Sequence, residues 1–290
     1  MEIRLEIPDR FQGHTLRDFL RTGGMSAAAI KSVKYQTQGF FLDGQPVHLK
    51  VPVSPGQKVF FQLPPEKDTS VEAQPLPLKV AYEDSFAMVV DKPAGIAVHP
   101  TLNHPGNTLA NGYRYYMESK GCPAVFRPVN RIDKNTSGLV LCAQNSFSAP
   151  FLAASVTKEY LAVVEGALPL GEGEISAPIG RRPDSIIGRC VTPQGKASVT
   201  QYQVLEVRGG YSLVKCIPIT GRTHQIRVHF SWLGHPLAGD DLYGGSRTVI
   251  GRHALHCGLM EFTLPFTQTR VKVTSPLPQD MAEIQKWESR

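Results

Sequence analysis

The amino-acid sequence predicts an α+β protein in which a large domain with a mixed or antiparallel central sheet follows a small α+β domain. Three observations support this fold class. The chain of 290 residues is long enough for one large and one small domain. Residues 64–78 are rich in proline and polar residues, as in an extended linker, and strand-like apolar runs dominate from about residue 79. We therefore predict a small domain at residues 1–65, a linker at 66–78 and a large domain at 79–290.

The composition is that of a globular chain with a substantial core, with 41% hydrophobic and 19% charged residues. No apolar run approaches the roughly 18 residues that a membrane span needs, and the N-terminus lacks the apolar core of a signal peptide. We therefore expect a cytoplasmic protein without membrane association. The net charge of +6 permits an anionic partner such as nucleic acid but does not prove one. The 5 scattered cysteines form no C-x-x-C pair, which argues against a disulfide framework.

Two helices are expected at the front of the small domain. The first, at residues 15–21, carries three apolar side chains on one helical face: Leu16, Phe19 and Leu20. The second, at residues 27–35, follows Ser26, whose side chain can cap the N-terminus of the helix. Lys31 and Lys34 on this second helix either contact an anionic partner or form a solvated face.

The other elements are mostly predicted strands joined by recognisable turns. In the small domain, Asp-Gly at 43–44 and Pro-Gly at 55–56 indicate turns between strands. In the large domain, residues 86–99 favour a strand, a Lys-Pro turn and a second strand. Residues 198–217 favour a hairpin around a Gly-Gly pair. Unbroken or alternating apolar runs predict further strands at 138–142 and 158–166.

The most informative segment is residues 129–141, with the sequence VNRIDKNTSGLVL. Its one acid, Asp133, stands between Arg131 and Lys134, in the loop that we expect before the strand at 138–142. Nearby cations keep a carboxylate ionised, because an opposite charge favours the charged form. The charge spacing alone leaves two interpretations open, a structural ion pair and a catalytic nucleophile.

A second motif lies at residues 221–230, with the sequence GRTHQIRVHF. We expect Thr223 to cap a helix that ends at Gly234. The predicted buried side of this helix carries three residues: Ile226, Phe230 and Leu233. The free backbone N–H groups at its start and the guanidinium of Arg222 suit a phosphate or a carboxylate. Arg227 on the same helix either pairs with a surface acid or belongs to a site.

These motifs resemble those of the RluA-type pseudouridine synthases, which isomerise uridine in RNA. The signature R-x-D-x-x-T-S-G matches residues 131–138, and the block G-R-x-H-Q-x-R matches residues 221–227. The resemblance implies that Asp133 is the catalytic nucleophile and that Arg227 pairs with its carboxylate. Tyr160, by itself a half-buried strand aromatic, would lie in the active site. Its ring would pack against the target base, and its hydroxyl would be a candidate proton acceptor.

The resemblance covers roughly residues 80–270 and implies roles for neighbouring residues. Arg131 would occupy the space that a flipped-out base vacates, although its simpler role is a second ion pair for Asp133. Asn130 stands where many family members have histidine, which bears on the substrate or the subgroup. Blocks such as 234–244 have family counterparts that we assign to the fold and the RNA groove. The front of the chain resembles an S4-type RNA-binding module. The predicted RNA contacts are Arg131, Asn130, Arg222, Lys31 and Lys34.

The predicted function is therefore isomerisation of specific uridines to pseudouridine in structured RNA. Ribosomal RNA is favoured over transfer RNA, because S4-bearing relatives commonly act there. The reaction needs no redox change or group donor, and the histidines and cysteines lack metal-ligand spacing, so we expect neither a cofactor nor a metal. Nothing in the sequence demands more than a monomer. The sequence does not choose between attack at uracil C6 and assistance at ribose C1′.

Two other functions stay open at this level. One is a non-catalytic RNA-binding or ribosome-assembly factor on the same scaffold, for which a nucleophile would be unnecessary. The other is a glycosidase-like hydrolase, which would need a second carboxylate opposite Asp133. The motifs supply no such partner acid, and hydrolysis would release free uracil.

Overall fold

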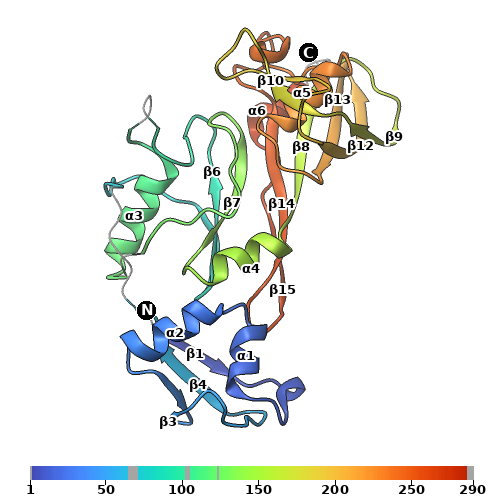
Figure 1. Ribbon diagram of the computed structural model, residues 1–290. Helices are drawn as coiled ribbons and strands as arrows, with labels where there is room; N and C mark the ends of the chain where they lie inside the picture. Colours follow the sequence, from blue (N-terminus) through green and yellow to red (C-terminus); the bar gives the residue numbers. More distant parts are fainter. Residues whose placement is uncertain (1, 65–70, 102–104, 123, 286–290) are drawn as a thin grey trace.

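The computed structural model describes residues 2–64, 71–101, 105–122 and 124–285, and its N-terminal part is a four-stranded antiparallel sheet packed with two helices (Figure 1). The strand order in this sheet is β1-β4-β2-β3. The elements in chain order are β1 (Glu2–Glu6), the 3-10 turn η1 (Asp9–Phe11), α1 (Leu16–Thr22), α2 (Ala27–Gln36), β2 (Phe40–Leu42), β3 (Gln45–Val47) and β4 (Lys58–Gln62).

Both helices of this part begin at the side-chain caps that the sequence contains. The hydroxyl of Thr15 accepts the backbone N–H of Asp18, and the carboxylate of Asp18 accepts the N–H of Thr15, which together form a capping box. The hydroxyl of Ser26 accepts the N–H of Ala29 in the same way. The predicted apolar face of α1 is buried: Leu16, Phe19 and Leu20. Both helix predictions are confirmed.

The Asp-Gly pair forms the tight turn between β2 and β3. Asp43 and Gly44 have φ values of 48° and 81°, and the strands they join pair Leu42 with Gln45. Two successive positive φ angles are the requirement of a type I′ turn, which glycine and aspartate tolerate better than most residues. The carboxylate of Asp43 also accepts the N–H of Lys58 at 2.8 Å, so the turn is tied to β4.

The rest of the chain is built on a nine-stranded sheet with the order β5-β6-β7-β14-β8-β13-β12-β9, and β15 pairs with β14. β7 and β14 run parallel and the other pairs are antiparallel, so the predicted α+β class with a mixed sheet is confirmed. The elements are β5 (Val80–Glu83), β6 (Ala87–Lys92), α3 (Leu109–Ser119), β7 (Ser137–Ala143), α4 (Ser148–Ser155), β8 (Thr157–Glu165), β9 (Gly171–Ser176), β10 (Ile179–Arg181), β11 (Arg189–Val191), β12 (Val199–Arg208), β13 (Tyr211–Pro218), α5 (Gln225–Trp232), the 3-10 turn η2 (Asp241–Tyr243), β14 (Leu255–Thr263), β15 (Arg270–Thr274) and α6 (Gln279–Gln285).

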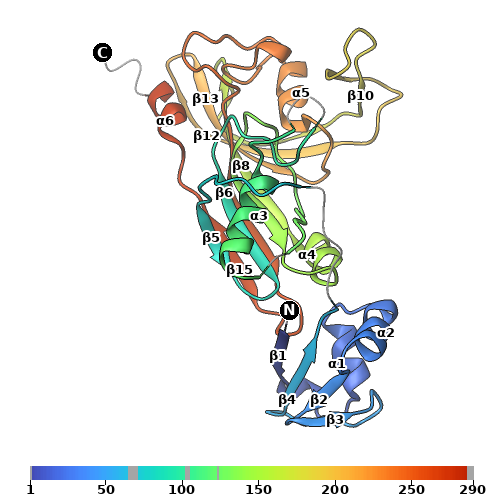
Figure 2. The same cartoon turned by 90° about the vertical axis from the view of Figure 1, so that its left-hand side faces the viewer.

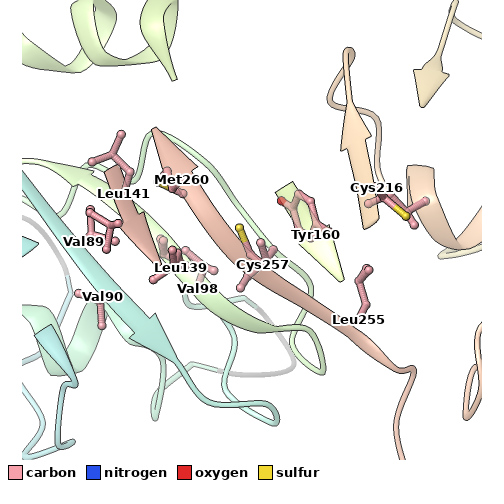
Figure 3. Packing of buried hydrophobic residues seen from close by; sticks show 14 of the residues in the cluster. Val89, Val90, Val98, Leu139, Leu141, Tyr160, Cys216, Leu255, Cys257 and Met260 are labelled. Atoms are coloured by element: carbon pink, nitrogen blue, oxygen red, sulfur yellow. The ribbon is translucent and has the colours of Figure 1, made fainter. Parts of the chain in front are cut away.

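The centre of this sheet is where β14 lies between β7 and β8. Cys257 on β14 pairs with Gly138 on β7 and with Tyr160 on β8. Figure 3 shows Cys257 and Tyr160 side by side. Gly138 has a φ of 106°, and a Cβ atom there would lie 2.3 Å from the carbonyl oxygen of Cys257. Only glycine allows the two backbones to approach this closely. The register of one strand therefore brings the loop before β7 next to Tyr160.

The second strand predicted in residues 96–99, after the Lys-Pro turn, does not form. The carbonyl oxygens of Ala97 and Val98 accept instead from Leu109 and Ala110, the first N–H groups of α3. A helix N-terminus leaves its first N–H groups without partners inside the helix, so this segment satisfies them. The prediction was therefore wrong because a long-range partner replaces the strand ladder.

Helix α5 ends as predicted, with Gly234 at a φ of 81° directly after the C-cap, but its start differs from the prediction. It begins at Gln225, and the N-cap residue is His224 in a left-handed conformation, so Thr223 is not the cap. The side chain of Gln225 accepts the N–H of Arg222 at 3.0 Å and turns the chain before the helix. Of the three side chains predicted to be buried, the first two are buried and the third, at the helix end, is 37% exposed: Ile226, Phe230 and Leu233.

A cluster of aromatic rings joins the N-terminal part to the large sheet. The apolar core around α1 and α2 extends to three phenylalanines from the large part of the chain: Phe86, Phe147 and Phe266. The ring of Phe266 lies 5.3 Å from that of Phe19, and its carbonyl oxygen accepts from Arg10. A Cβ atom on Gly23 would lie 2.0 Å from the Phe266 ring, so this glycine makes room for it. The two parts are packed together where α4 and the β14–β15 turn meet α1 and α2 (Figures 1 and 2).

The predicted linker falls only partly within the described residues, because its first part at 66–70 lies outside them. Residues 71–78 form neither helix nor strand. They lie against α3. The side-chain amide of Asn111 donates to the carbonyl oxygen of Glu72, and the backbone carbonyl of Asn111 accepts the N–H of Gln74. The division into domains at residues 65 and 78 stays a prediction. In the described part of the chain, no helix is long and apolar enough to cross a membrane.

Candidate active site

The loop at residues 131–136, directly before β7, carries Asp133. Its backbone is fixed by the fully buried ammonium group of Lys92, which donates to three carbonyl oxygens at 2.8–3.0 Å: those of Pro93, Ile96 and Lys134. The hydroxyl of Thr136 lies 2.8 Å from Nε2 of His253, and both side chains are buried. The acid is thus aimed by a rigid loop, as predicted from its place before a core strand.

Arg227 on α5 lies between two carboxylates. Its Nη1 donates to Oδ2 of Asp133 at 2.8 Å, while Nε and Nη2 donate to both oxygens of Asp240 at 2.7 and 2.8 Å. Asp240 is 1% exposed and Arg227 is 6% exposed. Burial acts to lower the pKa of Arg227, but the bonds and charge of Asp240, together with Asp133, raise it above the ordinary value. The guanidinium is therefore a permanent cation held in one orientation.

The carboxylate of Asp133 is 29% exposed. Burial acts to raise its pKa, but the charge that His224 carries when it is protonated, the charge of Arg227 and the hydrogen bond from Arg227 outweigh that effect, so the pKa falls below the ordinary value. Asp133 is consequently ionised at neutral pH. One half-buried anion faces solvent through the site, while the second acid of the group, Asp240, is sealed behind Arg227.

Tyr160 lies on β8 and is 8% exposed. Burial raises the pKa of its phenol well above the ordinary value, and the neighbouring Cys257 raises it further (Figure 3). Burial raises the pKa of the Cys257 thiol to about 12 as well. Both groups therefore keep their protons at neutral pH, and Tyr160 presents a neutral ring to the site.

A cavity of about 390 Å³ connects these side chains. Asp133, Tyr160 and Arg227 all line it, although they come from a loop, a strand and a helix that are far apart in the sequence. Three of the predicted RNA contacts also line it: Arg131, Asn130 and Arg222. The other two, Lys31 and Lys34, are exposed on α2, outside this cavity.

Asn130 lies at the cavity wall, but its amide is used inside the protein. Its Oδ1 accepts the N–H of Leu141 at 2.8 Å, and its Nδ2 donates to the carbonyl oxygen of Leu139 at 3.2 Å. The side chain is buried, and these two hydrogen bonds hold the segment before Asp133 against β7. The amide of Asn130 therefore supports the Asp133 loop from inside the protein, and its contact with RNA stays a prediction.

Three residues of the site were not singled out by the sequence. Besides Asp240, these are His224 and Tyr243, whose Nδ1 and hydroxyl lie 2.7 Å apart. The guanidinium carbon of Arg227 lies 4.9 Å from the centre of the Tyr243 ring. His224 is the fixed histidine of the G-R-x-H-Q-x-R block at residues 221–227. Asp240 and Tyr243 lie in the block at residues 234–244, which we assign to the fold and the RNA groove. Nothing in that block says which of its two acids turns inward.

Among the described residues, no group of three or more histidine, cysteine, aspartate or glutamate side chains is arranged to hold a metal ion. What the site offers is one ionised carboxylate, a fixed guanidinium behind it, a neutral phenol and a cavity open to solvent. This set can add a nucleophile to an electrophilic carbon and stabilise the charges that develop.

Comparisons with known proteins bear on this site. Residues 87–232 match the family described as RNA pseudouridylate synthase. The uncharacterized RNA pseudouridine synthase YjbO of Bacillus subtilis (strain 168) is 37% identical over 281 residues, which are 95% of this chain and 99% of that protein. The ribosomal large subunit pseudouridine synthase D of Xylella fastidiosa is 35% identical over 84% of this chain and 79% of its own length. Among solved structures, human RNA pseudouridylate synthase domain containing 1 has a TM-score of 0.57 at 31% identity, covering 73% of this chain and 86% of the human chain.

Proposed function

The chain belongs to the RNA pseudouridylate synthase family, and on this premise we propose that it converts uridines of ribosomal RNA to pseudouridine with Asp133 as the nucleophile. As a member of the family it is an RNA pseudouridine synthase, an isomerase that acts on uridine in RNA. The ribosomal substrate is supported by relatives named ribosomal large subunit pseudouridine synthase D, at 35% and 36% identity. The cytoplasmic location expected from the sequence belongs to the same proposal.

The observation that carries the proposed role of Asp133 is the contact of its carboxylate with Arg227 at the wall of the cavity. The reaction breaks the bond between N1 and C1′, turns the uracil, joins C5 to C1′, and moves a proton from C5 to N1. An ionised carboxylate can attack C6 of the uracil or support departure of the base at C1′. The oxygen Oδ2 is held by Arg227, whereas Oδ1 makes no hydrogen bond to the described residues, which leaves it for the substrate.

Arg227 and Tyr160 serve this step without a change of charge. Arg227 keeps Asp133 ionised and stabilises the carboxylate when it leaves the substrate again. The position of Arg227 is itself fixed by Asp240. Because the pKa of Tyr160 is raised, a phenolate would be costly, so we assign its ring to packing against the base and not to proton removal. The proton from C5 then leaves by another acceptor, such as water in the open cavity.

The target base must leave its helix to reach a side chain that is only 29% exposed. Extrusion costs roughly a few kcal/mol of stacking and pairing. Arg131 is exposed at the mouth of the cavity, next to Asp133, and we propose that it fills the space that the base vacates. Arg222 lies on the same rim and is placed to contact a phosphate near the extruded nucleotide.

The N-terminal part is proposed as an S4-like RNA-binding module. Lys31 and Lys34 lie exposed on α2, and the ammonium of Lys34 lies 4.9 Å from the ring of the exposed Tyr35. A helix face with two cations and an aromatic ring suits a phosphate backbone with an unstacked base beside it. Because the aromatic cluster packs this part against the large sheet, RNA held here would have a fixed direction toward the cavity.

The test is pseudouridine mapping in ribosomal RNA from a strain that lacks the protein. We expect wild-type protein to restore specific sites, Asp133→Ala to restore none, and the surface control Glu118→Gln on α3 to behave as wild type. The Asp133→Ala protein should still fold and bind the RNA. Restored sites in the Asp133→Ala strain would contradict the proposed nucleophile. RNA binding without isomerisation by the wild type would instead favour a non-catalytic factor, and release of free uracil would favour a hydrolase.

A further inference from the structure

His224 stands out in the site because its backbone is left-handed although it is not glycine. Its φ and ψ are 58° and 20°, at the N-cap of α5. Such a conformation is uncommon for a side chain of this size and clusters at functional sites, where the surrounding structure maintains it. The conformation turns the imidazole into the cavity, with its side chain 14% exposed and Nε2 3.7 Å from Oδ2 of Asp133.

The hydrogen bonds around Tyr243 decide which nitrogen of His224 carries the proton. The phenol oxygen of Tyr243 accepts the backbone N–H of Arg189 at 3.0 Å and lies 2.7 Å from Nδ1 of His224. These are its two hydrogen-bonding partners among the described residues, so the phenol proton is directed to Nδ1. Burial raises the pKa of Tyr243 and lowers that of His224, so the phenol and the imidazole are both neutral near pH 7. With Nδ1 accepting, the imidazole proton lies on Nε2.

This Nε2–H group faces the cavity without a hydrogen-bond acceptor within the described protein. At 3.7 Å, Oδ2 of Asp133 is too far to accept from it directly. Oδ2 already accepts a shorter hydrogen bond from Nη1 of Arg227, at 2.8 Å. A fixed donor that is 14% exposed and has no acceptor requires an acceptor from the substrate or from water.

We propose that His224 is a specificity-determining residue whose Nε2–H donates to a carbonyl oxygen of the extruded uracil, with Tyr243 holding it in that tautomer. This inference rests on the proposed function, because the base must reach Asp133. Uracil offers two carbonyl oxygens, O2 and O4. Cytosine has an amino group in place of O4, so a bond to O4 would also exclude cytidine. A neutral imidazole also avoids a competing ion pair with Asp133.

The tautomer can be measured in the free protein, independently of any catalysis. We expect ¹⁵N shifts of the histidine ring at pH 7 to show Nδ1 unprotonated and Nε2 protonated, with the signals of this residue assigned by their loss in His224→Asn. Asparagine tolerates the left-handed backbone and so preserves the fold. A proton on Nδ1, or a doubly protonated ring, would overturn the proposed assignment. A loss of isomerisation by the whole protein would not affect this measurement, which separates it from the proposed function.

The contact with the base is tested by sulfur substitution in the target uridine. Sulfur is a weaker acceptor, so we expect either 2-thiouridine or 4-thiouridine to slow single-turnover isomerisation by wild type about tenfold, as for loss of one hydrogen bond. The other position should have a smaller effect, which identifies the oxygen. In His224→Asn and His224→Ala the same substitution should have much less effect, because the donor is displaced or absent. If both thio substrates slow the wild type and the variants equally, His224 does not contact the base and the proposal is wrong.

Discussion

At the scale of single residues, the site is organised around one buried cation. Arg227 is shared between an acid that faces the cavity and an acid that is sealed from solvent. Such a triad keeps its geometry because each partner would be costly to leave alone. The arrangement also explains how Asp133 stays ionised although burial opposes its charge.

The cation of Arg227 also stabilises the fold, because it neutralises the buried Asp240. Replacement of Arg227 by methionine should lower the free energy of unfolding by about 3–5 kcal/mol, because Asp240 is left charged, buried and unpaired. Urea denaturation at neutral pH measures the change. The matched control is Arg247→Met, which removes an exposed pair with Asp241 and should change stability little. An equal effect of the two substitutions would contradict a structural role for the Asp240 pair.

Residue-level roles were only partly predictable from the sequence. Asp133, Tyr160 and Arg227 could be named because fixed-residue motifs surround them, and all three line one cavity. Asp240 could not be named, because it is one of two adjacent acids and only the tertiary fold turns it toward Arg227. His224 is a fixed residue of the second motif, but the sequence gave it no role, because the role proposed for it depends on a backbone angle and on Tyr243.

At the scale of elements, the site depends on how the loop before β7 is held. Lys92 at the end of β6 binds three carbonyl oxygens, two from the following turn and one from the Asp133 loop. A single buried amino group therefore joins the turn after β6 to the Asp133 loop by hydrogen bonds, although neither segment is helix or strand. Burial lowers the pKa of Lys92 to about 7, and the effects of Asp133 and Arg252 on it have opposite signs.

This pKa predicts a specific pH dependence of stability. An unfolded lysine titrates near 10.5, so between about pH 7 and 10.5 the unfolded chain binds more protons than the folded chain. The free energy of unfolding should therefore gain a contribution from Lys92 as the pH rises through this window. In Lys92→Met that contribution should be absent. Denaturation curves at several pH values, compared between the two proteins, measure it. Parallel pH profiles would show that Lys92 is charged in the folded state throughout.

Elements that depend on neighbouring residues could be predicted from the sequence, whereas elements that depend on distant residues could not. The cap of α2 and the Asp-Gly turn were predictable because each rests on residues a few positions apart. The parallel pairing of β7 with β14 was not, since it joins Gly138 to Cys257. The strand expected at 96–99 failed for the same reason, because its carbonyl groups bind a helix that begins ten residues later.

At the scale of the whole molecule, the N-terminal part and the large sheet share a packed aromatic joint. The ring of Phe266 contacts those of Phe19, Phe86 and Phe147, with centroid distances of 5.3–5.8 Å. Its side chain is 2% exposed although its own φ is 62°. The sequence predicted two domains and a linker, but it gave no sign of this joint, whose members are spread over almost 250 residues.

Removal of this ring should loosen the two parts from each other. We expect Phe266→Ala to cost about 3–5 kcal/mol, as for other buried phenylalanines, and to split one calorimetric transition into two. The control Tyr35→Ala removes a ring that is 67% exposed and should leave the transition unchanged. A single transition of unaltered midpoint in Phe266→Ala would show that the joint contributes nothing to stability.

The measurement that tests the proposed catalysis most directly is the single-turnover rate of Asp133→Asn. Its substrate is the target RNA with uridine still unmodified. Asparagine keeps the shape of the side chain and removes its charge, so folding and RNA affinity should stay close to wild type. We predict that no pseudouridine forms above background with this variant, while wild type converts its target under the same conditions. Isomerisation by Asp133→Asn at a rate near that of wild type would contradict the assignment of Asp133 as the nucleophile.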